Sequence, residues 1–261
     1  MDQFIQKLAK AGGKIALSKF RKIKSFKTKT HRKDLLTAAD LAANNFIINK
    51  IKARFPSHGI VTEEKFSKDK IGKGYTWIVD PLDGTNAFAH GIPFFCTAIA
   101  LLMDKEVILA AVYDPNHDEL FFAKKNSGAY LNGKKIKPVV RNKLWQTSGS
   151  FLFTYELPFR KRRELSLRAH RAFFDHEIAL VRPPAIILNE CYVAAGRLDL
   201  MFWRNFYIWD TAPGYLIMKE AGVKVTNFQG QPWSIKDKGF IAARPVIYKQ
   251  LYPILKKNRI T

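Results

Sequence analysis

Apolar residues recur near helical spacing over the first twenty residues of the chain, with lysines between them. The apolar positions are Phe4, Leu8, Ala11, Ile15 and Phe20. This period is typical of an amphipathic helix that buries one side and turns the other toward solvent or a partner. The sequence therefore predicts a helix at this end of the chain.

A second helix is predicted from Thr37 to about Phe55. Thr37 suits an N-cap, and Asp40 falls at the third helical position, where its carboxylate can complete a capping box. Apolar side chains continue the pattern as far as Ile51. Pro56 ends the helix, because the residue before a proline disfavours helical geometry.

Short apolar runs separated by turn residues predict a sheet in the rest of the first half. The runs cover residues 59–62, 75–79, 96–103, 107–113, 120–123 and 129–131. Asp104-Lys105 and Asp114-Pro115-Asn116 lie between neighbouring runs and are typical of turns in an antiparallel meander. We therefore expect two helices packed on a largely antiparallel sheet.

After about residue 141, strand and helix patterns alternate, which is typical of an α/β arrangement. Strands are predicted over residues 148–153, 178–181, 198–202, 223–226 and 239–242. Helices are predicted over residues 161–174, 185–195, 210–221 and 246–255, the last interrupted by Pro253. The division is an N-terminal α+β half, 1–140, and a C-terminal α/β half, 141–261, which we expect to pack as one unit.

Composition places the chain among ordinary globular proteins. It has 261 residues, of which 47% are hydrophobic and 25% charged, and this excludes a disordered chain. The longest uncharged apolar run, residues 92–103, is shorter than the ~20 residues that span a bilayer, and no signal-peptide pattern opens the sequence. Cys96 and Cys191 lie far apart in apolar surroundings, as buried thiols in a reducing compartment do. We expect a soluble cytoplasmic protein without membrane insertion.

The formal net charge is +22, from 44 Lys and Arg against 22 Asp and Glu. Eleven basic side chains fall within residues 1–33, and a second cluster, Arg160–Arg163, is followed by Arg168 and Arg171. Such patches can bind nucleic acid or steer an anionic substrate. A lysine-rich solvated surface is the simpler explanation, because basic residues occur along the whole chain and no nucleic-acid-binding motif accompanies them.

One strongly apolar strand leads directly into two carboxylates, Asp80 and Asp83, on either side of a proline turn. Pro81 fixes the direction of that turn, Gly84 permits close approach of the backbone to a ligand, and Thr85 adds a hydroxyl. The amides after Asp83 can form a nest for an anion. Carboxylates beside an anion site require a cation between them, and oxygen ligands with a phosphate indicate Mg²⁺.

Further ligands must come from other segments. Two metal ions ~3.5–4 Å apart need a bridging carboxylate, which Asp80 could supply. Glu63-Glu64 lie at the end of another strand, and Asp210 opens a helix, whose dipole favours a negative charge there. Taken alone, Glu63 would be interpreted as a surface residue and Asp210 as an N-cap.

In combination these segments resemble the inositol monophosphatase family of Mg²⁺-dependent, lithium-sensitive sugar phosphatases. The resemblance covers nearly the whole chain and rests on Asp34–Asp40 (DLLTAAD), Glu63-Glu64, Asp80–Thr85 (DPLDGT), Ala194–Asp199 (AAGRLD), Trp209–Gly214 (WDTAPG) and Glu220–Gly222 (EAG). It implies a mixed α/β (α+β) fold layered as an αβαβα sandwich. It also implies Mg²⁺-dependent hydrolysis of a phosphate monoester of a small polyol or sugar by a metal-activated water.

The resemblance also implies a set of metal ligands. Glu63, Asp80 and the Leu82 carbonyl would hold one Mg²⁺, and Asp80, Asp83 and Asp210 a second. A third, weaker Mg²⁺ would lie near Glu63, and Li⁺ would inhibit.

The remaining roles implied by the resemblance concern water and phosphate. Asp40 and Thr85, with Glu63 beside the third ion, would position the attacking water and help to deprotonate it. The amides of Gly84, Thr85 and Asn86 would bind phosphate oxygens. The family further implies a homodimer, and some bacterial members associate with transcription and ribosomal RNA maturation machinery.

The sequence departs from the family pattern where the family recognises its substrate. Ala185 stands in the sequence PAII instead of a Gly-Ser/Thr-Ala-Ala segment, and Asn86 replaces a second threonine. Trp203 replaces a glutamate that bonds inositol hydroxyls, so discrimination by hydrogen bonding should weaken. Trp203 could stack on the substrate or turn into the core. Arg204 could pair with a second anionic group, which would favour a bisphosphorylated sugar or nucleotide.

Overall fold

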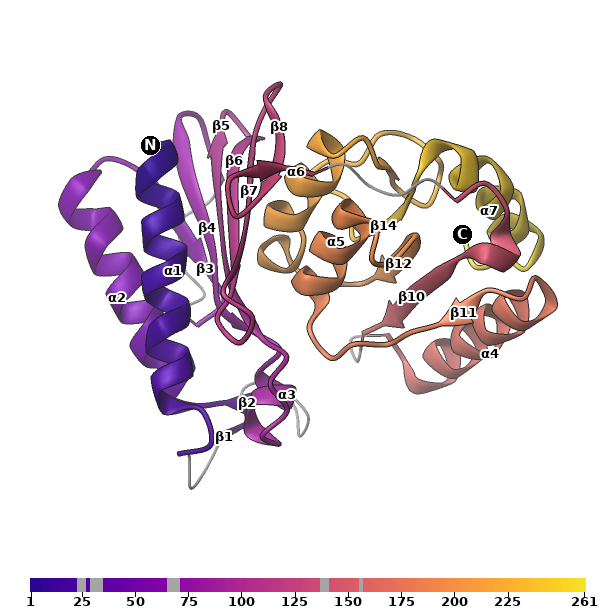
Figure 1. Cartoon of the computed structure of the whole chain (residues 1–261), viewed down its shortest axis with the longest axis horizontal. Coiled ribbons are helices and arrows are strands. Elements are labelled where there is room, and N and C mark those ends of the chain that lie inside the picture. The colour runs from indigo at the N-terminus through magenta and orange to yellow at the C-terminus, as the bar shows by residue number, and fades with distance from the viewer. Residues whose placement is uncertain (23–26, 29–34, 65–70, 137–140, 155–156) are drawn as a thin grey trace.

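Two helices, α1 (Asp2–Lys19) and α2 (Ala38–Arg54), cover one face of a seven-stranded sheet. In a computed structural model of the chain, shown in Figure 1, this sheet is followed by a middle helical layer, a five-stranded sheet and an outer helical layer. The αβαβα sandwich expected from the resemblance is confirmed. The structure describes residues 1–22, 27–28, 35–64, 71–136, 141–154 and 157–261.

The first sheet has the order β3-β4-β5-β6-β7-β8-β9. Its strands are β3 (Gly59–Thr62), β4 (Tyr75–Asp83), β5 (Cys96–Met103), β6 (Glu106–Asp114), β7 (Glu119–Lys124), β8 (Gly128–Leu131) and β9 (Lys134–Lys135). β3 runs parallel to β4, and each later pair is antiparallel, so the predicted meander is confirmed. Three elements near its lower end were not predicted from the sequence: the paired short strands β1 (Lys27–Thr28) and β2 (Leu35–Leu36), and helix α3 (Thr85–Ala89).

The second sheet has the order β11-β10-β12-β14-β13. Its strands are β10 (Ser148–Phe153), β11 (Ala179–Leu180), β12 (Leu200–Arg204), β13 (Lys224–Thr226) and β14 (Gly239–Ala243). Helices α5 (Ile186–Ala195) and α6 (Ala212–Glu220) lie between the two sheets, and α4 (Phe159–Asp175) and α7 (Pro245–Lys257) cover the outer face (Figure 1). The alternation predicted for this half is confirmed.

The C-terminal helix differs from its prediction. Pro253 does not interrupt α7, which runs through it to Lys257. Proline removes one helical hydrogen bond. The apolar side of α7, including Ile247 and Leu251, is buried against the second sheet, and this packing keeps the helix continuous.

The two halves of the chain share one hydrophobic cluster. Val112 and Phe121 of the first sheet belong to it together with Leu216 of α6 and Phe240 of the second sheet. The two halves therefore pack together, as expected from the sequence. The boundary at residue 140 stays a prediction, because residues 137–140 lie outside the described ones. Within the described ranges, no helix combines the length and apolar character needed to cross a bilayer.

Candidate active site

The first turn of α2 holds Asp40 in a fully buried position. The Thr37 amide donates to Asp40 Oδ2 at 2.7 Å, and the Thr37 hydroxyl donates to the same oxygen. The Ala39 amide donates to Thr37 Oγ1 at 3.2 Å. This is the predicted capping box, and it fixes the orientation of the Asp40 carboxylate.

Thr85 connects Asp40 to the end of β4. Its hydroxyl oxygen lies 3.1 Å from Asp40 Oδ1 and 3.0 Å from the Leu82 carbonyl oxygen. A hydroxyl carries one proton, so Thr85 donates to one of these oxygens at a time and keeps lone pairs for another donor, such as water. Three of the predicted groups therefore meet at one point.

The end of β4 orients the two aspartates of the proline turn. The strand does not stop before Asp80, as the sequence predicted, but continues to Asp83 with a shift in its register against β5. Such an irregularity redirects side chains. Asp80 is 2% exposed, and its Oδ1 accepts a hydrogen bond from the Leu82 amide at 2.9 Å. The Pro81 carbonyl in turn accepts from the Thr97 hydroxyl at 2.7 Å.

Gly84 makes the sharp turn from β4 into α3. Its φ is +91°, and a Cβ at this position would lie 2.8 Å from the Phe94 carbonyl oxygen, so only glycine fits. The amides of Thr85 and Asn86 lie in the first turn of α3, directly after Gly84. The phosphate-binding role of these amides stays a prediction.

Asp83 ties the two halves of the chain together. Its Oδ1 accepts from the Ile186 amide at 3.2 Å and its Oδ2 from the Ile187 amide at 2.7 Å, both at the start of α5. The pKa of Asp83 is raised to about 6, because burial and, to a smaller extent, the charge of Glu63 raise it by more than these amides lower it. Glu63 therefore lies near Asp83, and its own amide continues the ladder of β3 by donating to the Val79 carbonyl at 3.2 Å.

Asp210 ends a short 3₁₀ helix, Ile208–Asp210, immediately before α6. Its Oδ2 accepts from the Tyr207 amide at 2.9 Å. Asp83 and Asp210 both raise the pKa of Glu190, a fully buried residue of α5, although burial is the larger cause. Glu190 is thus an electrostatic neighbour of both aspartates.

Glu190 was not predicted as a site residue. The surrounding segment reads as an apolar helix, and Glu190 was the one charged side chain within Ala185–Ala195. A carboxyl group at a buried helical position is the signal that could have identified it.

The donor set fits a hard divalent cation by its chemistry. Glu63, Asp80, Asp83 and Asp210 supply carboxylate oxygens, and the burial of Asp83 disfavours its charge unless a cation compensates it. The aspartates are held by backbone amides as described above. Across the described part of the chain, no three His, Cys, Asp or Glu side chains already converge at metal-binding distance.

Three of the residues that depart from the family pattern near the expected substrate site, Ala185, Trp203 and Arg204, have different surroundings. Ala185 is buried against Gly84. Trp203 is 3% exposed and belongs to the hydrophobic cluster between the two sheets, so of its two predicted alternatives it turns into the core. Arg204, the next residue of β12, lies with its guanidinium carbon 4.5 Å from the centre of the Phe228 ring. Among the described residues, no hydrogen bond or ion pair links Trp203 or Arg204 to the carboxylates.

Comparison with known proteins places this geometry in a family. The model of the inositol monophosphatase family matches residues 1–259. The chain belongs to that family. The resemblance found in the motifs is therefore confirmed, and the protein is a phosphatase, a phosphoric monoester hydrolase.

Relatives within the inositol monophosphatase family carry different names. Inositol monophosphatase 3 of Solanum lycopersicum is 37% identical over 246 residues, 90% of each chain. A fructose-1,6-bisphosphatase/inositol-1-monophosphatase of Aquifex aeolicus is 33% identical over 95% of this chain and 92% of its own. The Nus factor SuhB of Vibrio cholerae is 33% identical over 97% of this chain and 94% of its own.

Solved structures of family members have the same fold. The IMPase of Thermotoga maritima superposes with a TM-score of 0.89 at 29% identity and covers both chains fully. A lithium-soaked inhibitory complex of staphylococcal inositol monophosphatase-1 gives a TM-score of 0.85 at 25% identity, over 98% of this chain and 94% of that one. The family is metal-dependent.

Proposed function

We propose that the protein hydrolyses a phosphate monoester of a small polyol or sugar and uses Mg²⁺ as its cofactor. The meeting of Asp40, Thr85 and the Leu82 carbonyl beside Asp80 and Asp83 carries the proposal. A hydroxyl and a buried carboxylate are placed together there, next to a turn suited to phosphate.

In this proposal Glu63, Asp80 and the Leu82 carbonyl would hold one Mg²⁺, and Asp80, Asp83 and Asp210 would hold a second. A third, weaker ion would lie near Glu63. When bound, the ions neutralise the phosphoryl oxygens, activate the attacking water and stabilise the leaving oxygen.

The chain's own groups orient the reactants. Thr85 accepts a hydrogen bond from the attacking water while its proton is donated to Asp40 or to the Leu82 carbonyl, and Asp40 takes up a proton as the water attacks. Glu63 would help to activate the attacking water through the third ion. The amides of Gly84, Thr85 and Asn86 hold the phosphate oxygens, which aligns phosphorus with the water.

A panel of phosphate esters tests the proposal. The purified protein should release phosphate from inositol 1-phosphate or another small monoester in the presence of Mg²⁺. Chelation by EDTA should abolish this release, because the metal carries most of the charge stabilisation, and Li⁺ should inhibit it. Phosphate release that continues undiminished in EDTA would contradict the proposal.

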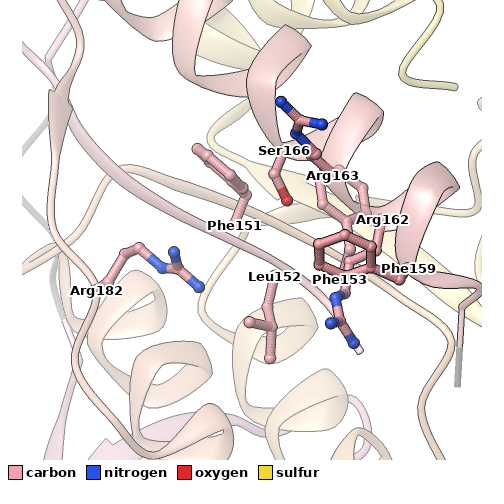
Figure 2. A pocket seen from close by; sticks show the side chains of 8 residues that line it. All are labelled: Phe151, Leu152, Phe153, Phe159, Arg162, Arg163, Ser166 and Arg182. Carbon is pink, nitrogen blue, oxygen red and sulfur yellow. The ribbon is translucent and has the colours of Figure 1, made fainter. Parts of the chain in front are cut away.

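A second substrate class, a bisphosphorylated sugar or nucleotide, is favoured by a basic pocket rather than by Arg204. A cavity of about 320 Å³ lies between the start of α4 and the segment before α5 (Figure 2). Its lining residues are Phe151, Leu152, Phe153, Phe159, Arg162, Arg163, Ser166 and Arg182. Three guanidinium groups suit a phosphate, and the aromatic rings suit the flat face of a sugar or base.

The segment before α5 connects the pocket to Asp83. Arg182 lines the pocket, and four residues later the Ile186 amide binds Asp83. Neither Arg163 nor Arg182 forms an ion pair within the described ranges. Their charges are therefore available to a second anionic group on the substrate.

Replacing Arg182 by alanine tests this substrate class. The KM for fructose 1,6-bisphosphate should rise roughly tenfold, the cost of one charge-assisted hydrogen bond, while the KM for a monophosphate stays unchanged. Arg171→Ala, at the other end of α4, is the control, because Arg171 pairs with Asp175 outside the pocket. Equal changes for both substrates in steady-state assays would count against a second phosphate site.

A regulatory role through RNA or the transcription machinery is the alternative that the basic surface suggests. Arg160, Lys161 and Arg163 are exposed at the start of α4, as are Lys7 and Lys14 on α1. If the protein binds RNA, affinity should fall steeply with salt, and reversing the three α4 charges should abolish binding. A binding curve that is insensitive to salt would exclude this role.

Two further expectations stay predictions. The homodimer is supported by α4, which exposes Phe159, Leu167 and Phe174, the last to 85%. A solution mass near twice the 29.9 kDa of one chain would confirm it, and a mass near 29.9 kDa would exclude it.

The cytoplasmic location is expected from the sequence alone, and fractionation of cells that produce the protein would test it.

A further inference from the structure

Glu190 is a buried carboxyl group that the family resemblance does not account for. It has no exposed surface, and neither of its two carboxyl oxygens has a hydrogen-bond partner. A buried charged group is ordinarily paired, hydrogen-bonded or bound to a metal. Glu190 therefore needs either a proton or a cation nearby.

Helix geometry directs this side chain toward Asp83. The amides of Ile186 and Ile187 bind the Asp83 carboxylate, and Glu190 lies three to four residues later, on the same side of α5. Side chains on a helix point back toward its N-terminus. The Glu190 carboxyl group thus extends toward the end of α5 that holds Asp83.

Helix α6 leaves space for the same carboxyl group. A Cβ on Gly214 would lie 1.7 Å from Glu190 Oε2, so the absence of a side chain at Gly214 is what admits this oxygen. Gly214 lies about one helical turn after Asp210. The Glu190 carboxyl group consequently occupies the space between α5 and the first turn of α6.

Electrostatics agrees with this position. Burial raises the pKa of Glu190 well above its ordinary value, and the charges of Asp83 and Asp210 raise it further. Neighbouring carboxyl groups, of which Asp83 and Glu190 are buried and Asp210 is half-buried, repel one another when they are ionised without a cation. A divalent cation between Asp83 and Asp210 would compensate all three.

We propose that Glu190 is a further acidic residue of the divalent-cation site. Its carboxyl group lies between α5 and α6, near Asp83 and Asp210, and its charge there strengthens cation binding. This inference rests on the proposed function, because it requires a cation at those two aspartates. Glu190 is a positioning residue in this role: it acts on the substrate only through the cation. The competing role is a neutral acid that merely fills the space beside Gly214.

The two roles differ in what they do to cation affinity. Glu190→Gln keeps the shape of the side chain and removes its charge. If Glu190 supports the cation, the variant should bind Mg²⁺ roughly 10-fold more weakly, as loss of a supporting group around a metal site does. Its metal-free form should melt at a higher temperature than wild type, and Mg²⁺ should raise that temperature by less.

Isothermal titration with Mg²⁺ and thermal melting with and without Mg²⁺ measure both effects without substrate. Glu190→Met, an apolar side chain of similar length, is a second variant in case the glutamine perturbs folding. Glu164→Gln, on the exposed side of α4, is the matched control and should bind Mg²⁺ as wild type does.

Asp83→Asn in the same titration separates this inference from the proposed function. Weaker binding by Asp83→Asn and by both Glu190 variants supports the inference. Weaker binding by Asp83→Asn alone overturns it and leaves the proposed function standing. Unchanged Mg²⁺ affinity in all three variants overturns both.

Discussion

Asp83→Asn is expected to reduce kcat for phosphate release about 10³-fold, the upper range for loss of one electrostatic contact in a transition state. Asparagine has one oxygen, whereas Asp83 uses two to accept the amides of Ile186 and Ile187. The variant therefore loses a charge at the cation site and a link between the two halves of the chain at once. Steady-state assays at saturating Mg²⁺ measure the loss.

The matched control is Asp175→Asn, an exposed aspartate of α4 whose ion pair with Arg171 is at the surface. It should keep full activity. Wild-type activity in Asp83→Asn would show that Asp83 does not hold a catalytic cation, and the proposed metal site would then be wrong.

The pH dependence of stability reports on Asp83 independently of activity. Burial raises its pKa to about 6, so the folded protein binds a proton that the unfolded chain, with a pKa near 3.8, does not bind between these values. Metal-free wild type should therefore gain stability from Asp83 as the pH falls from about 6 to about 4. Asp83→Asn should lack this part of the gain in denaturant titrations, because asparagine does not titrate.

Thr85→Val is expected to lower kcat roughly 10²-fold, the lower range for loss of a group that positions a proton transfer. Valine has the shape of threonine but cannot bond to Asp40 Oδ1 or to the Leu82 carbonyl. Substrate binding relies on backbone amides in the same turn, which valine retains, so KM should change little. Initial-rate measurements over a range of substrate concentrations separate the two constants.

Thr85→Ser is the control for this prediction, because serine keeps the hydroxyl. It should restore most of the wild-type kcat. Equal kcat values for the valine and serine variants would mean that the hydroxyl does not orient the water, and the role of Thr85 would then reduce to its amide.

Local chemistry in the sequence was enough to predict the parts of the site that short segments build. Thr37 and Asp40 lie within one helical turn, so their capping box follows from residue types and spacing. The turn after Asp80 needs a proline, a glycine and a hydroxyl in order, and these too are local requirements. The αβαβα class followed from the motif resemblance, and the alternation of strand and helix patterns in the second half agreed with it.

Burial and long-range contacts were not predictable in the same way. Trp203 was equally compatible with a substrate contact and with the core, and its burial depends on which face of β12 meets the middle helices. β4 extends to Asp83 because β5 pairs with it there, and α7 continues through Pro253 because its apolar side is packed. Each outcome depends on a partner segment that is far away along the chain.

The sequence by itself determined the chemistry of this protein: which carboxylates, which hydroxyl and which phosphate-binding turn are present, and hence the family. Only the tertiary structure decided that Asp83 is held by the start of α5 and that Glu190 lies between α5 and α6, next to two other acids. The physical reason is that residue types and spacing set local hydrogen bonds, whereas the surroundings of a buried charge are set by helices brought together through packing.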